Sequence, residues 1–327
     1  MNPDSGVTMN PSNGATMNPS NGAAMNPSNG AAMNPSNGAT MNPEPAHEGL
    51  RIGISAWAAD RKGVERVAEA ALGAGIDTFW LGDGLLERPD FPPWSGGMES
   101  FGELAWLAGR YPGASVALGA AVLPLRDPQW VAKSAATLDQ LTEGRFTLVL
   151  APGNWPDEFA AMGRDFGSRG ATLETGFRSL REIWSAGAGD GGPSPRPWSP
   201  GGPPVWLAGA RATMLRAIRL GLPFQASRIG PSALAPVARE WFDKGGTKLA
   251  VRVRMGVGRT GPAAGSSPPT ATDTGALIGP SSFLAEQVGA FRELGVTDLS
   301  IMPGQDAEAS LRTIEALAEQ ALPALAP

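Results

Sequence analysis

The stretch SVALGAAVLPLRDPQWVAKSAATLDQLTEGRFTLVLA, residues 115–151, decides the fold because it holds one complete strand–helix–strand unit. Apolar runs at 115–122 and 146–151 each predict a buried strand, and the run 128–141 between them predicts a helix. Asp127 stands at the N-cap position of that helix, where its side chain can accept hydrogen bonds from the first turn. Strands that are apolar throughout are typical of a parallel sheet covered by helices. The stretch therefore predicts an α/β protein.

The same alternation fills the chain from Arg51 onward. The predicted strands, each followed by a predicted helix, lie at 51–57, 76–81, 115–122, 146–151, 204–209, 223–227, 249–258 and 297–303. Eight consecutive strand–helix units in about 275 residues are typical of a (β/α)8 TIM barrel. A doubly wound open sheet is the alternative, but ISAWAADRKG after the first strand lacks the G-x-G-x-x-G phosphate-binding pattern. We therefore expect one TIM-barrel domain over 49–327.

Residues 1–48 differ from the remainder in composition. Five tandem octads fill 1–40, four of them reading MNPSNGA followed by Ala or Thr, and a sixth starts at Met41 and breaks off. Pro, Gly, Asn and Ser dominate, so the segment has too little apolar surface to offset the chain entropy that ordering would remove. We predict a disordered low-complexity tail, with an adhesive or partner-binding tail as the alternative. The only histidine of the chain, His47, lies in this segment.

Composition excludes several classes of site and partner. Without cysteine there is no disulfide or thiolate metal site, and one histidine cannot form a cluster, so we predict no metal. The net charge of −5 gives no basic footprint for nucleic acid or an anionic membrane. No apolar run approaches the roughly 18 residues of a membrane-spanning helix, and the N-terminus lacks the features of a secretory signal. We expect a cytoplasmic protein with no nucleic-acid or membrane partner.

Asp83 is the first candidate site residue. In a TIM barrel the site residues lie at the C-terminal ends of the strands, and Asp83 follows the strand 76–81 between two glycines. It is either a cofactor or substrate contact or a capping group in a tight turn, and the sequence leaves both open. Arg126, in the turn before the helix 128–141, is interpreted as a structural link.

Two further groups of charged residues reach the same rim. Asp157 and Glu158 follow the strand 146–151, at a helix start where the dipole favours acids. We interpret Glu158 as a capping residue and Asp157 as a candidate cofactor contact. Arg252 and Arg254 alternate along one strand and therefore face the same way, either inward toward an anion or outward toward acids of the flanking helices.

Residues 116–163, VALGAAVLPLRDPQWVAKSAATLDQLTEGRFTLVLAPGNWPDEFAAMG, with RGATLETGFRSLREIW (169–184) after them, resemble the bacterial luciferase-like oxidoreductases. The shared phrases are an L-G-x-x-V strand, a P-L-R-x-P turn, A-K-x-A-A-T-L-D, a G-R-F strand and E-F-x-x-x-G. Weaker similarity continues in 68–83, 204–218 and 291–302. The resemblance implies a TIM-barrel oxidoreductase, in particular a monooxygenase, that uses reduced FMN or the deazaflavin coenzyme F420 on a small organic substrate. Similar proteins often form homodimers.

The end of the third predicted strand is the first cofactor-binding segment that the resemblance implies. In similar proteins this segment lies against the isoalloxazine ring and contains a non-prolyl cis peptide. Carried over to this sequence, the segment is Ala120, Ala121 and Val122, with the cis bond between Ala121 and Val122. Read without the resemblance, these are simply small residues at a crowded barrel end.

The turn after the fifth predicted strand is the second such segment. Gly209 and Ala210 would let backbone N–H groups approach the cofactor phosphate at a helix N-terminus, where the helix dipole favours an anion. Arg211 could add a positive charge. The motif alone is weak, because many strand–helix turns contain glycine.

The substrate pocket is the third region that the resemblance addresses. Trp57, Gly84 and Trp155 are its candidate lining residues. Many members that use the deazaflavin have a histidine after the aspartate where this chain has Gly84, so the histidine-based dehydrogenase mechanism is in question and no catalytic residue is predicted. A flavin-binding but weakly active protein is therefore one alternative. An unrelated TIM-barrel isomerase or hydrolase is the other, disfavoured because such enzymes commonly need a paired acid and base.

Overall fold

The structure is a computed structural model, and it describes residues 49–55, 60–86, 97–186, 194–258, 270–271, 276–304 and 306–325. The predicted tail 1–48 and the pocket candidate Trp57 lie outside these residues. No helix in the described part is long and apolar enough to cross a membrane.

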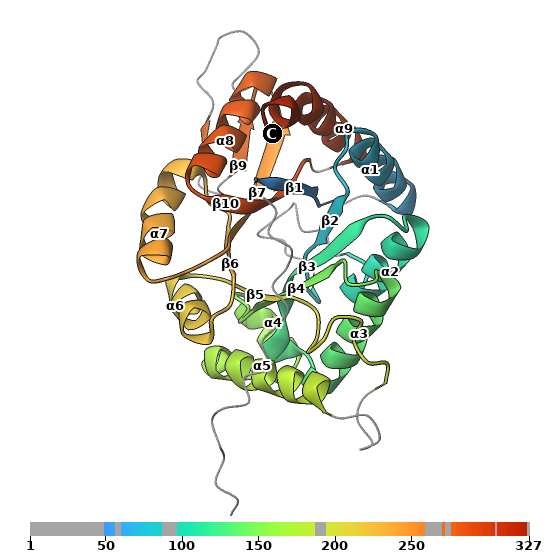
Figure 1. Cartoon of the computed structure of the whole chain (residues 1–327), viewed down its shortest axis with the longest axis vertical. Helices are drawn as coiled ribbons and strands as arrows, with labels where there is room; N and C mark the ends of the chain where they lie inside the picture. Colours follow the sequence, from blue (N-terminus) through green and yellow to red (C-terminus); the bar gives the residue numbers. More distant parts are fainter. Residues whose placement is uncertain are drawn as a thin grey trace, which may run out of the picture. The chain divides into compact units, whose positions relative to one another are not determined.

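A closed barrel of eight parallel strands forms the centre of the domain (Figure 1). The barrel strands are β1 (Arg51–Ile54), β2 (Thr78–Leu81), β3 (Ser115–Val122), β4 (Phe146–Ala151), β5 (Val205–Ala208), β6 (Phe224–Ser227), β7 (Leu249–Val257) and β10 (Val296–Met302). Each pairs with its neighbour in chain order, and β10 closes the ring by pairing with both β7 and β1. The predicted TIM barrel is confirmed.

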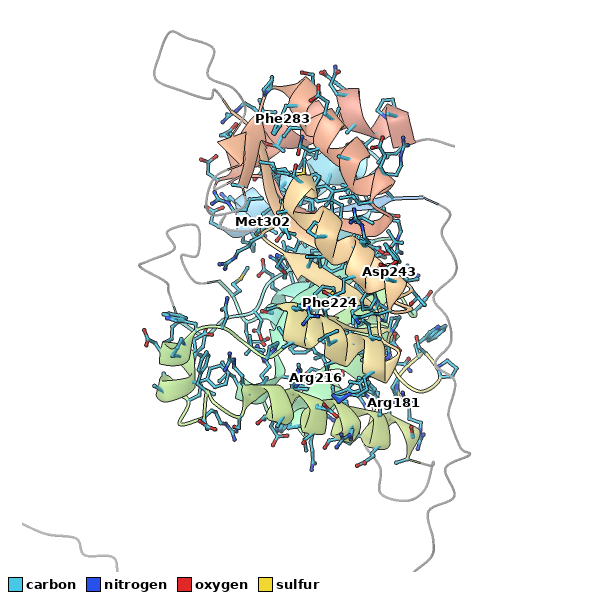
Figure 2. The ribbon with its side chains drawn as sticks, turned by 90° about the vertical axis from the view of Figure 1, so that its left-hand side faces the viewer. Arg181, Arg216, Phe224, Asp243, Phe283 and Met302 are labelled. Carbon is cyan, nitrogen blue, oxygen red and sulfur yellow. The ribbon has the colours of Figure 1, made fainter. Side chains whose placement is uncertain are left out.

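Helices surround the barrel, as Figure 1 shows. They are α1 (Arg61–Gly73), α2 (Ser100–Arg110), α3 (Pro128–Leu141), α4 (Pro156–Ala161), α5 (Arg169–Ser185), α6 (Arg211–Leu220), α7 (Pro231–Asp243), α8 (Ser281–Glu293) and α9 (Ala307–Ala316). Figure 2 shows α5, α6 and α7 next to one another, and Arg216 of α6 donates a hydrogen bond to Glu174 of α5 (3.2 Å). The N-cap prediction for α3 is confirmed, because Asp127 accepts from the backbone N–H groups of Gln129 (2.8 Å) and Trp130 (3.3 Å).

Two segments differ from the sequence-based expectation. The segment between β7 and α8, for which no strand was predicted, contains two short strands, β8 (Thr270–Ala271) and β9 (Ala276–Gly279). These two strands pair antiparallel, and β9 extends the sheet from β7. The last predicted helix changes after Ala316 into a π-helical turn and then a 3-10 turn over Leu322–Leu325. Pro323 explains this change, because proline has no N–H to donate and its ring crowds the preceding turn.

Large aromatic side chains fill the inside of the barrel. Trp80 of β2 and Trp206 of β5 lie with ring centroids 5.9 Å apart, and small residues of the other strands pack around them. Gly53 of β1 makes room for Trp80, because a Cβ at this position would lie 2.4 Å from the indole nitrogen. A separate and larger apolar cluster lies between the strands and the helices. The tryptophan layer closes the barrel, so the site must lie above it, at the C-terminal ends of the strands.

Candidate active site

Asp83 braces the ends of β2 and β3. Its carboxylate accepts hydrogen bonds from Val122 N (3.0 Å) and from Arg126 Nε (2.9 Å) and Nη2 (2.6 Å), and Ser100 Oγ lies at 3.3 Å. The side chain is only 5% exposed. Burial alone would lower the pKa of Arg126, but its hydrogen bond to Asp83 and the charges of Asp83 and Glu99 raise that pKa above its usual value. Both carboxylate oxygens of Asp83 are thus engaged by the protein, and Arg126 is the structural link that the sequence indicated.

Gly84 lines a cavity of 510 Å³ next to the ion pair of Asp83 with Arg126. The cavity lies between the loop after β2, the start of α2 and the first turns of α3, and Trp130 and Ser134 line its far side. None of its lining residues comes from β5, β6, β7 or β10. The cavity is therefore lateral to the barrel mouth.

The end of β3 corrects one expectation. The cis peptide lies between Gly119 and Ala120, and the predicted position between Ala121 and Val122 was wrong. Pairing with β4 shifts register at the same place, because Gly119 pairs with Val149 and Ala121 with Leu150. Ala120 is therefore the extra residue of β3, whereas Val122 is already held by Asp83. Ala120 and Val122 are half-buried and Ala121 is fully buried, so Ala120 and Val122 are the partly exposed residues of the segment.

Glu158 holds the loop that follows β2. It is 6% exposed, and its Oε1 accepts hydrogen bonds from the backbone N–H groups of Leu85 (2.7 Å) and Leu86 (3.4 Å). It stands in the first turn of α4, where the helix dipole favours an acid, as the capping interpretation expected. Its carboxylate also reaches a segment 73 residues away in sequence, which the sequence did not indicate. Asp157 is exposed, and Trp155 is half-buried.

The turn between β5 and α6 leaves a helix N-terminus open. Gly209 has φ +154°, and a Cβ there would lie 2.7 Å from Thr213 Oγ1, so no side chain fits without a shift. Ala210 is the N-cap of α6 and provides no side-chain hydrogen bond. Thr213 N–H already donates to the Ala210 carbonyl oxygen (2.8 Å), so the N–H groups of Arg211 and Ala212 are the ones suited to an anion. Arg211 is 67% exposed and pairs with Glu240 of α7 through two hydrogen bonds (2.9 and 2.5 Å). Its guanidinium is therefore turned toward α7.

Arg252 lies inside the barrel mouth. Its side chain donates hydrogen bonds across the barrel to the carbonyl oxygen of Gly119 on β3 and to Ser55 Oγ (3.2 Å) after β1. Of the two orientations that the alternation on β7 allowed, the inward one is confirmed for Arg252. Burial, and then the charge of Arg228, lower the pKa of Arg252 to about 10, so that it stays protonated at neutral pH. Burial also lowers the pKa of Arg254, two residues further along.

Two buried polar residues near Arg252 were not predicted as site residues from the sequence. Gln225 of β6 is fully buried, and neither its amide oxygen nor its amide nitrogen has a hydrogen-bond partner among the described residues. Ser300 of β10 is equally buried, and its Oγ is also unpaired there. Gln225 Nε2 would lie 3.4 Å from a Cβ on Gly119. The only sequence signal was that each is a polar residue with an apolar residue on either side.

These features fit a cofactor that has a polar ring and a phosphate group. Buried polar atoms are normally hydrogen-bonded, so Gln225 and Ser300 indicate that another molecule, water or ligand, completes this layer. Arg252 gives the layer a positive charge, and the open N-terminus of α6 is suited to a phosphate. Among the residues with described positions, no group of three or more His, Cys, Asp or Glu is arranged to hold a metal ion.

The family is clear from comparison with known proteins. A family model described as luciferase-like monooxygenase matches residues 44–247, more than half of the chain, and the chain belongs to this family of oxidoreductases. The pyrimidine monooxygenase RutA of Variovorax paradoxus is 34% identical over 102 residues, which is 30% of this chain and 27% of that protein. The F420-dependent glucose-6-phosphate dehydrogenase of Amycolatopsis mediterranei is 30% identical over 151 residues, 42% of each chain. The matches thus span less than half of these relatives.

Solved structures show the same fold. The oxygenating constituent of 3,6-diketocamphane monooxygenase from Pseudomonas putida, in complex with FMN, superimposes with a TM-score of 0.65. The match covers 85% of this chain and 99% of that one, at 14% sequence identity. At this identity the likeness supports the barrel alone.

Proposed function

We propose that this protein is a flavin-dependent oxidoreductase, specifically a monooxygenase, that uses reduced FMN or F420 on a small organic substrate. The observation that carries the proposal is a buried polar layer at the barrel mouth. Gln225 and Ser300 have no hydrogen-bond partner among the described residues, and Arg252 beside them is hydrogen-bonded only to neutral groups. On the same rim, the N-cap of α6 provides no side-chain hydrogen bond. Because the chain belongs to the luciferase-like monooxygenase family, we assign a flavin or deazaflavin cofactor to this layer.

Each segment of the rim has a part in the proposed site. The N–H groups of the first turn of α6 would bind the cofactor phosphate, with Gly209 allowing close approach. The end of β3 from Gly119 to Val122 would support the ring, held from one side by Arg252 and from the other by Asp83. When bound, the cofactor supplies the redox and oxygen chemistry, while the protein supplies placement and electrostatics.

Monooxygenation is proposed over dehydrogenation because the barrel offers no imidazole. Gly84 stands directly after Asp83, and the chain's only histidine, His47, precedes the barrel. Relatives with monooxygenase and F420-dependent dehydrogenase names are both present, so the cofactor itself must be tested. We further propose a cytoplasmic protein that forms a homodimer, as extensions of the family resemblance.

Titration of the purified protein with FMN and with F420, followed by absorbance and fluorescence, tests cofactor binding. We expect one of the two to bind with micromolar or better affinity. The reduced complex is then mixed with air, with and without candidate substrates, and oxygen uptake and product are measured. Substrate-dependent oxygenation supports the proposal. Failure to bind either cofactor contradicts it, and binding without any substrate turnover favours the weakly active alternative.

Gly209→Val gives this test a matched variant. A side chain at position 209 collides with Thr213 and covers the N-terminus of α6, so we expect weaker binding of FMN but unchanged binding of riboflavin, which has no phosphate. Gly289→Ala, within α8, is the control, since a Cβ there has nothing within 4 Å and its backbone is helical. Equal weakening of FMN and riboflavin by Gly209→Val would contradict the phosphate assignment.

A further inference from the structure

Exposed apolar side chains gather around the lateral cavity, the space of 510 Å³ that Gly84 lines. In the described part of the chain seven large apolar side chains are exposed, and four of them line this cavity. These four are Leu85, Met98, Trp130 and Met162, which are between 41% and 68% exposed. A concave group of exposed apolar side chains indicates a binding site, whereas scattered ones do not.

The inner wall of the cavity is apolar as well. Phe101, Leu125 and Val131 are buried and line it, and Ser134 contributes the only hydroxyl among the described lining residues. The volume lies within the roughly 300–1,000 Å³ of small-molecule sites. The cavity can therefore enclose an apolar molecule and form a hydrogen bond to it through Ser134.

The charged side chains in the wall are already engaged by the protein. Asp83 and Glu99 both pair with Arg126 (2.6 and 3.0 Å), and the Asp127 carboxylate caps α3. Arg126 is thus shared between two carboxylates and has no surplus charge for an anionic ligand. The described lining residues include three carboxylates and one guanidinium, so the cavity repels an anion.

The cavity adjoins the segment on which the cofactor ring would lie. Val122 lines the cavity, and it follows Ala120 directly after Ala121 at the end of β3. Gln225 and Arg252, which belong to the polar layer assigned to the cofactor, do not line it. A molecule in the cavity would therefore lie against the end of β3 and leave the cofactor layer free.

We propose that the lateral cavity binds the substrate, and that this substrate is an uncharged, largely apolar molecule with an aromatic ring. Trp130 and Phe101 provide aromatic side chains for contact with such a ring. Met98 and Met162 have flexible side chains that adapt to its shape. This assignment rests on the proposed function, because the occupant is a substrate only if the cofactor lies beside it.

Two fluorescent probes that share one ring skeleton test the assignment. N-phenyl-1-naphthylamine is neutral, whereas 1-anilinonaphthalene-8-sulfonate carries a negative charge on the same rings, and both become brighter in an apolar site. In titrations of the full-length protein we expect the neutral probe to bind with a dissociation constant of about 10 µM and the sulfonate about tenfold more weakly. Equal or tighter binding of the sulfonate, or no binding of the neutral probe, would overturn the assignment.

Matched variants of α3 show whether the probe occupies this cavity. Ser134→Phe fills part of the cavity and should weaken binding of the neutral probe about tenfold. Gln129→Phe places the same side chain on an exposed position of α3 outside the cavity and should leave binding unchanged. If Ser134→Phe does not fold, Trp130→Ala at its exposed position replaces it, with an expected loss of about threefold. Unchanged binding in the variant used would overturn the assignment.

Competition on the wild type separates a substrate from other occupants. FMN and F420 should not displace the neutral probe, and in the oxygenation assay the probe should raise the KM of the substrate without lowering kcat. Displacement by either cofactor, or an unchanged KM, would overturn the assignment. So would probe binding that falls as protein concentration rises and dimers form, because a second copy would then cover the cavity. If neither cofactor binds while the neutral probe does, the proposed function fails and the cavity remains a ligand site, which distinguishes the two failures.

Discussion

The two sides of the barrel rim differ in whether their buried polar groups have partners within the described protein. On the β2–β3 side, Asp83 is bound by Arg126 and Val122, and Glu158 is bound by the loop after β2. On the β6–β7 side, Gln225 has no described partner and Arg252 has no described anion. Polar groups whose hydrogen bonds are made within the protein need no ligand, whereas buried polar groups without a partner indicate that a further molecule binds beside them. We therefore propose that the cofactor lies on the β6–β7 side, against the end of β3, and that the ion pair of Asp83 with Arg126 on the first side contributes to stability.

Asp83→Asn should give the largest effect. It breaks a pair that is mostly buried and leaves Arg126 without its principal partner, so we expect the free energy of unfolding to fall by about 3 kcal/mol. Urea unfolding followed by circular dichroism measures it. Glu240→Gln breaks a pair whose Arg211 is 67% exposed and which solvent screens, so it should lower stability far less. Equal losses of unfolding free energy in the two variants would contradict the expectation that the buried Asp83–Arg126 pair stabilises the protein more than the exposed Arg211–Glu240 pair.

Glu103 of α2 is the exception on the paired side, because burial alone raises its pKa to about 7. An acid with a raised pKa in the folded state favours folding at low pH, and this advantage is lost as pH rises from 4.5 through about 7. Glu103→Gln should therefore be more stable than the wild type at pH 8, by about 2 kcal/mol after allowance for partial exposure, and equal to it at pH 4.

Unfolding curves at both pH values check the Glu103 expectation. A constant difference between Glu103→Gln and the wild type across this pH range would show that Glu103 does not titrate as described.

Glu158→Gln should have a smaller effect on stability and a local one on motion. It weakens the charge-assisted hydrogen bonds to Leu85 and Leu86, at a cost of about 1 kcal/mol. Amide exchange at 85–86 should become faster while the barrel strands stay unchanged. Asp157→Asn, at the exposed neighbouring position, is the control and should leave exchange at 85–86 as it is. Unchanged exchange in Glu158→Gln would mean that this carboxylate does not hold the loop.

Arg252→Met should have the smallest effect on stability, and it sharpens the comparison most. Removing a buried cation that has no anionic partner relieves its desolvation, which offsets the two lost hydrogen bonds. We expect the free energy of unfolding without cofactor to change by less than about 1 kcal/mol. A loss of unfolding free energy as large as that of Asp83→Asn would show that Arg252 stabilises the fold in the same way as Asp83.

The sequence was sufficient where the signals are local. The helix predicted over 128–141 begins and ends at Pro128 and Leu141, because Asp127 caps its first turn and that contact spans only a few residues. The strand order followed from the repeated strand–helix alternation, since eight such units close into a barrel.

The site was harder to predict because its contacts join distant segments. Glu158 reaches 85–86, and Arg252 reaches Gly119, 133 residues away in sequence. Nothing in the string PFQAS shows that Gln225 would face a layer without partners. The cis peptide was displaced from its predicted position because the register shift of β3 falls at Ala120, and register is set by the pairing with β4.

Amide hydrogen exchange of the wild type, with and without reduced FMN or F420, tests the central claim most directly. If the cofactor lies over the side with unpaired polar groups, bound cofactor should slow exchange in the first turn of α6, at 210–214, and at the end of β3, at 119–122. Exchange along α3, which lines the lateral cavity, should not change. Protection confined to α3 and the loop at 83–86, or none at any cofactor concentration, would contradict the account.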